Sequence, residues 1–172
     1  MIMPRGEPLL MPVNPVFIWV SLLAGLAVNM VPLGRVAWTP DLIMVLLVFW
    51  GVHQPLRVGM GAACVLGLCM DVSQSALLGQ HALAYTVASF GALVLHRRLL
   101  WLSVPEQLLP VFALFVVAHA VQLLLRVVSG GVFPGLWMVL APLLEAALWP
   151  LASWLLLAPQ RRPPDSNQNR PL

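Results

Sequence analysis

Residues 108–125 read LLPVFALFVVAHAVQLLL, a run in which no side chain carries a formal charge. A helix rises about 1.5 Å per residue and the hydrocarbon core of a bilayer is about 30 Å thick, so a crossing helix needs about 20 mostly apolar residues. Five more apolar stretches flank this run, at residues 16–33, 42–52, 58–70, 76–95 and 136–158. The pattern predicts an all-α integral membrane protein, with six transmembrane helices in one domain over residues 16–158.

The composition favours the same class of protein. Hydrophobic residues make up 60% of the 172 residues and charged residues only 9%, whereas soluble domains carry about 25% charged residues. The formal charge of +3 could indicate a nucleic-acid partner. The arginines lie at the ends of the apolar stretches, however, where they set the orientation of a membrane protein. We therefore expect membrane lipids and no nucleic acid around this chain.

The arginines are unevenly distributed between the two sides that six crossings would create. If residues 1–15 form a cytoplasmic leader, seven arginines face the cytoplasm and two face outward. The inner set is Arg5, Arg57, Arg97, Arg98, Arg161, Arg162 and Arg170, and the outer set is Arg35 and Arg126. Because cytoplasmic loops carry an excess of basic residues, both termini are predicted to be cytoplasmic. Residues 159–172 are rich in proline, asparagine and glutamine and are expected to form a disordered tail.

Two of the stretches, 42–52 and 58–70, are shorter than a bilayer requires. They could be short spans that a locally thinner bilayer tolerates. They could instead form a re-entrant hairpin that turns at residues 53–57. The hairpin would place Arg57 at membrane depth, where an arginine costs at least about 2.5–3.5 kcal/mol. Six crossings are therefore favoured.

Small residues recur in the third stretch and lead to an aspartate. Gly59, Ala63 and Gly67 are four residues apart, a spacing that lets a second helix approach closely. Asp71 could anchor the outer end of this helix–helix contact, or it could cap a helix at the lipid–water boundary. Because a charge left unpaired in a partly dry interface is costly, we expect Asp71 to lie near Arg126 or His81.

Two other carboxylates have distinct contexts. Asp41 follows Pro40 at the start of an apolar stretch, which indicates a helix N-cap with a negative charge near the positive end of the helix dipole. Glu145 lies inside the last stretch, where no bulk water is expected. It is either protonated, or paired with His119, Gln122 or Arg126, or turned toward the helix of a partner protein.

Catalytic and metal-binding patterns are not evident in the sequence. The four histidines are scattered over separate segments without ligand spacing, and no nucleophile stands beside a base. We therefore expect no metal, no cofactor and no enzymatic activity.

Four short motifs follow one another in a definite order. They are Pro40-Asp41, Pro55-x-Arg57-x-Gly59, Gly67-x-x-x-Asp71 and Leu78-Gly79-x-x-Ala82-Leu83. In order, spacing and chain length this pattern resembles the rod shape-determining membrane protein family MreD. The resemblance implies a non-enzymatic scaffold in the bacterial inner membrane that maintains cell shape during peptidoglycan elongation. It also implies MreC as a partner and, through MreC, the actin-like MreB, the glycosyltransferase RodA and a class B penicillin-binding protein.

The resemblance extends to fold, because the family is similar to the six-helix substrate-binding subunits of ECF transporters. A small-molecule-binding subunit of such a transporter is the alternative function. That class carries an Ala-x-x-x-Ala stripe, whereas Ala24 and Ala27 are one position too close. The residues expected to serve structure or partner contacts are Asp41, Arg57, Gly59, Ala63, Gly67, Asp71, Gly79, His81, Arg126 and Glu145.

Overall fold

The computed structural model describes residues 13–31 and 39–160, and this part of the chain is helical without a strand. The helices are α1 (Pro15–Met30), α2 (Leu42–His53), α3 (Met60–Ser73), α4 (Gln80–Trp101), α5 (Val104–Val128) and α6 (Leu140–Leu157), with short 3-10 helices η1 (Leu136–Val139) and η2 (Ala158–Gln160). Most of the expected leader and tail, and the arginines at 5, 35, 161, 162 and 170, lie outside the described residues.

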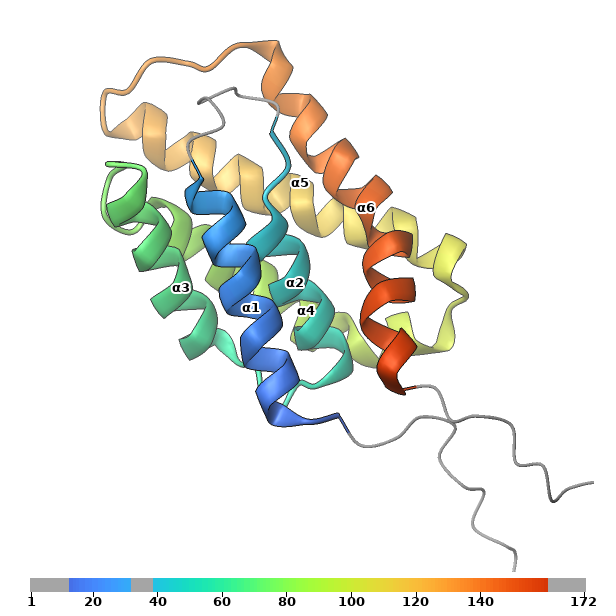
Figure 1. Cartoon of the computed structure of the whole chain (residues 1–172). Helices are drawn as coiled ribbons and strands as arrows, with labels where there is room; N and C mark the ends of the chain where they lie inside the picture. Colours follow the sequence, from blue (N-terminus) through green and yellow to red (C-terminus); the bar gives the residue numbers. More distant parts are fainter. Residues whose placement is uncertain (1–12, 32–38, 161–172) are drawn as a thin grey trace, which may run out of the picture.

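Consecutive helices run in alternating directions and form one bundle, which α5 crosses obliquely (Figure 1). One end, here called the Asp41 end, contains the end of α1 and the start of α2. The opposite end, here called the Arg98 end, contains the start of α1, the end of α4 and the last described residue, Gln160. The turn between α2 and α3 also lies there, because the Arg57 guanidinium donates a hydrogen bond of 3.0 Å to the carbonyl of Val13. The turn is therefore level with the start of α1.

The short helix α2 occupies the centre of the bundle. Every residue from Ile43 to Val52 except Leu46 is buried, and α2 packs against α1, α4 and α6. Two buried indoles donate their N–H groups to neighbouring helices at 2.9 Å: Trp50 of α2 to the Ser21 hydroxyl of α1, and Trp149 of α6 to the Gln107 side-chain oxygen of α5. At about 1.5 Å per residue, this 12-residue helix spans only about 18 Å. A helix enclosed in this way does not have to match the thickness of the lipid.

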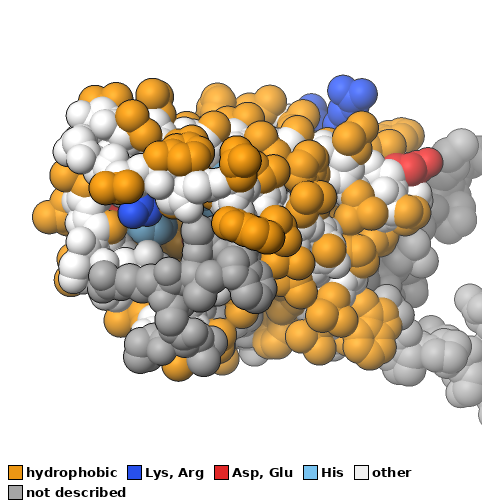
Figure 2. Space-filling view, turned by 90° about the horizontal axis from the view of Figure 1, so that it is seen from above, with side chains coloured by type: hydrophobic (Ala, Val, Ile, Leu, Met, Phe, Trp, Pro, Cys, Tyr) orange, Lys and Arg blue, Asp and Glu red, His pale blue; other side chains and the backbone are white. Residues whose placement is uncertain are grey.

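The outside of the bundle is predominantly apolar (Figure 2), with leucine, valine and tryptophan side chains exposed along the helices. Two helical stretches, Val104–Val128 and Leu136–Gln160, are long and apolar enough to cross a membrane, and α1, α2 and α3 are apolar but shorter. An exposed apolar surface of this extent is typical of a helical membrane protein, because lipid tails rather than water cover it.

The small residues of α3 form an internal contact with α4. A Cβ atom added to Gly67 would lie 2.4 Å from the Cα atom of Ala82, so the two backbones touch at this point. Ala63 is buried one turn away, as the expected stripe requires. Gly59 is not part of the contact: it is the N-cap of α3, and a Cβ atom there would meet nothing within 4 Å. The stripe therefore begins one turn later than the residue spacing indicated.

Candidate functional site

Asp41 is the centre of a partly buried polar cluster at the Asp41 end. Its carboxylate caps α2 by accepting a 3.2 Å hydrogen bond from the Met44 N–H, as expected of an N-cap. The same carboxylate accepts hydrogen bonds from the Asn29 amide of α1 and from the Tyr85 hydroxyl of α4. Asn29 in turn accepts from the Leu42 N–H at 3.2 Å. Asp41 thus joins α1, α2 and α4 in addition to capping a helix.

Glu145 extends this cluster to α5 and α6. Its Oε1 atom accepts from the Asp41 N–H at 2.9 Å and lies 2.9 Å from Nε2 of His119. Of the partners considered for Glu145, the structure selects His119, whereas Arg126 is exposed at the end of α5. Within the described residues, Oε2 of Glu145 and Nε2 of Gln122 are buried without a hydrogen-bond partner. This part of the cluster is therefore incompletely satisfied.

Asp71 forms a second cluster around the start of α4. Its fully buried carboxylate accepts hydrogen bonds from the N–H groups of Gly79 and His81 at 2.8 Å, and from that of Ala82 at 3.4 Å. These N–H groups begin a helix and have no acceptor within it. Asp71 of α3 therefore caps the neighbouring helix with a carboxylate that is buried within the protein.

The pairing expected between Asp71 and His81 is present. The Nδ1 atom of His81 lies 2.8 Å from Asp71 Oδ1, and within the described residues Asp71 makes no ion pair with Arg126. Gly79 makes the cap possible because its φ of +100° is in the left-handed region, which a residue with a Cβ atom adopts only under strain. Gly79 and Asp71 of the sequence motifs therefore act together.

The two clusters form one continuous network, because the His81 and Tyr85 rings meet edge to face with their centroids 5.9 Å apart. The network of Asp41, Asp71 and Glu145 with their partners connects all six α-helices near the Asp41 end. The network satisfies the first N–H groups of α2 and of α4 inside the protein, through Asp41 and Asp71 respectively. Unpaired backbone groups in a lipid-like interior cost several kcal/mol each.

The arrangement is suited to holding helices together. Among the described residues, no three histidine, cysteine, aspartate or glutamate side chains are placed to hold a metal ion. Arg57 and Arg126 lie outside the network, at the turn before α3 and in the last turn of α5 respectively. Sequence reasoning gave Tyr85 no role, although it is the only tyrosine of the chain and interrupts an apolar stretch. That isolation is the signal that could have identified it.

The comparison with known proteins concerns the helical region as a whole. The family model for rod shape-determining protein MreD matches residues 10–157. The chain belongs to the MreD family. The match contains every residue of the polar network and confirms the family that the four short motifs indicated. The members of this family are membrane proteins that determine rod shape. Their role is structural, and the family is not known as a family of enzymes. No solved structure matches the chain significantly.

Proposed function

We propose that this protein is a non-enzymatic inner-membrane scaffold of the peptidoglycan elongation complex. In this role it links MreC, and through it MreB, to RodA and a class B penicillin-binding protein. The observation that carries the proposal is the MreD family match over residues 10–157. Scaffold describes the role best because a rod-shape component without known chemistry acts through the proteins that it holds together.

The polar network supports a rigid scaffold. Asp41 and Asp71 use their carboxylates to cap helices and to bind neighbouring side chains, so both are committed to internal structure. Buried polar groups that find partners impose one arrangement on the elements that carry them, since any other arrangement leaves those groups unsatisfied. A bundle held in one arrangement would present a constant lipid-facing surface to partner helices.

The proposed orientation is six crossings with both termini in the cytoplasm. Three observations support it. The first is that one end of the bundle contains the start of α1, the turn with Arg57 and the last described residue. The second is that Arg97 and Arg98 lie at the same end, and Arg126 lies at the other. The third is that α2 is enclosed by other helices, so its short length does not argue against a second span.

Depletion of the protein in its rod-shaped host, combined with affinity purification of a tagged copy, tests the proposal. We expect rods to become spheres on depletion, and MreC to co-purify with the tagged protein from solubilised membranes. An unrelated multi-pass protein with the same tag serves as the purification control. Depleted cells that remain rods would refute the shape role, and loss of shape without MreC in the purified material would refute the scaffold role.

A further inference from the structure

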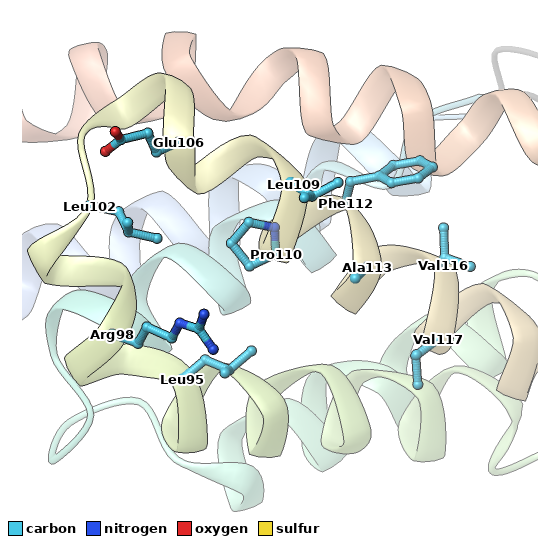
Figure 3. Close-up of a pocket in the computed structure, with 10 residues that line it drawn as sticks. All are labelled: Leu95, Arg98, Leu102, Glu106, Leu109, Pro110, Phe112, Ala113, Val116 and Val117. Atoms are coloured by element: carbon cyan, nitrogen blue, oxygen red, sulfur yellow. The ribbon is translucent and has the colours of Figure 1, made fainter.

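A groove of about 660 Å³ runs between α4 and α5 near the Arg98 end (Figure 3). Its walls are apolar, formed chiefly by Leu95 of α4 and by Leu109, Phe112 and Val116 of α5. Its volume lies within the range of about 300–1,000 Å³ that is common for small-molecule sites. The groove opens on the outer face of the bundle, where Leu109 and Val116 are exposed.

Local packing accounts for a groove at this level of α4 and α5. Farther along, a Cβ atom added to Gly91 of α4 would lie 2.3 Å from a methyl group of Leu114, so the helices are in close contact at that level. Toward the Arg98 end the lining residues of α5 include Pro110 and Ala113, the latter with a small side chain. Proline inside a helix also removes one backbone hydrogen bond and crowds the preceding turn.

The end of the groove carries an available positive charge. Arg98 extends into the groove in Figure 3, and within the described residues its guanidinium makes no hydrogen bond or ion pair. Glu106 also lines the groove as a negative charge, and its carboxylate is held toward Ser103 by hydrogen bonds from the Ser103 N–H and hydroxyl, at 2.8 and 2.7 Å. Arg97 lies next to Arg98 and is exposed. The groove thus combines apolar walls with an arginine that has no partner among the described residues and with a glutamate that is bound to Ser103.

We propose that this groove binds an anionic phospholipid, with the phosphate at Arg98 and an acyl chain along Leu109 and Val116. A planar guanidinium can donate two parallel hydrogen bonds to a phosphate. Basic pockets between transmembrane helices are known to accept anionic lipid headgroups. A partner helix fits less well, because it would bury the Arg98 guanidinium at a cost unless it also carried an acidic partner, whereas a phospholipid brings its own phosphate. The proposal does not depend on which proteins the scaffold holds.

Lipid titration of the purified full-length protein, followed by native mass spectrometry, tests this site. Phosphatidylglycerol and phosphatidylcholine are the anionic and zwitterionic probes, and Arg98→Gln is compared with the neighbouring exposed control Arg97→Gln. We expect tight binding of one phosphatidylglycerol to the unchanged protein. Arg98→Gln should weaken that binding about tenfold, and Arg97→Gln should weaken it less than twofold.

A second variant tests the apolar part of the groove. Ala113→Trp fills it, and the exposed position of Ala113 lets the protein fold, which size-exclusion chromatography checks. We expect this variant to lose its binding of phosphatidylglycerol, together with any weaker binding of phosphatidylcholine. Equal effects of the two arginine variants, or unchanged binding by folded Ala113→Trp, would overturn the proposal. So would competition by free inorganic phosphate, or cross-linking of a photoreactive residue at Val117 to a protein in place of lipid in native membranes.

Discussion

At the scale of single residues, Asp71 is a buried carboxylate that accepts hydrogen bonds from several donors. It satisfies the first N–H groups of α4 and also contacts the His81 ring, although its side chain is fully buried. The motif Gly67-x-x-x-Asp71 locates this residue on α3. The cap on α4 is visible only in three dimensions, because acceptor and donors lie on opposite sides of a turn.

Asp71→Asn should destabilise the protein, because the amide nitrogen that replaces one oxygen cannot accept a hydrogen bond from a backbone N–H. A buried donor left unsatisfied costs about 1–3 kcal/mol, and either orientation of the amide leaves at least one donor unsatisfied. The measurement is the thermal midpoint of the purified protein by size-exclusion chromatography after heating. Glu106→Gln, at an exposed helix cap, is the control and should shift the midpoint much less. Equal midpoints for Asp71→Asn and the unchanged protein would contradict this role.

Tyr85 offers a second test at the same scale, because its hydroxyl donates to Asp41 and its ring is fully buried. Tyr85→Phe keeps the ring and removes only the donor, so we expect a loss of about 1–3 kcal/mol in stability. Thr86→Val is the neighbouring control: its hydroxyl donates to the Ala82 carbonyl within α4 and joins no second helix. If both variants melt at the same temperature, Tyr85 does not hold Asp41 in place.

At the scale of elements, the contact between α3 and α4 depends on a glycine. A side chain at Gly67 would collide with the backbone of Ala82, which cannot turn aside as a flexible side chain can. Helix association in membranes relies on such close backbone approach, since apolar burial gives no driving force between helices in lipid. The spacing of small residues in the sequence predicted the contact, and the fold identifies α4 as the partner.

Gly67→Ala should separate α3 from α4 and lower the amount of folded protein severalfold, and Gly67→Leu should do so more severely. Gly59→Ala is the matched control, because a Cβ atom at Gly59 meets nothing within 4 Å and its φ is negative. Leu68→Ala, on the exposed side of α3, should also be mild. Protein level and MreC co-purification are measured in the same strain. Normal levels of Gly67→Leu would show that α3 and α4 do not require this approach.

At the scale of the whole molecule, the orientation in the membrane remains the broadest prediction. Single cysteines at Gln54, Arg97 and Gly130, in a background without Cys64 and Cys69, can be labelled with a reagent that does not cross membranes. We expect Gly130 to react in intact cells with a permeable outer membrane. Gln54 and Arg97 should react only after the inner membrane is opened. Reaction of Gln54 in intact cells would refute the six-span arrangement.

The sequence by itself determined the class of the protein and its family. Apolar length, arginine position and the four motifs are local properties, so they can be read without knowing which helices touch. It also indicated that Asp41 caps a helix and that Glu145 needs a partner. It could not assign the role of Tyr85, and it extended the small-residue stripe to Gly59, because a stripe acts only where a second helix meets it.

The tertiary structure decided which polar groups share the interior. Asp41 binds Tyr85, 44 residues away, and its N–H donates to Glu145, 104 residues away. Such pairs depend on the order in which helices pack and on the depth at which each ends, and residue spacing contains neither. The short α2 begins below its longer neighbours' ends, so its capping group must find partners inside the bundle. Helix packing supplies those partners, and this is the physical reason that the network is a property of the fold.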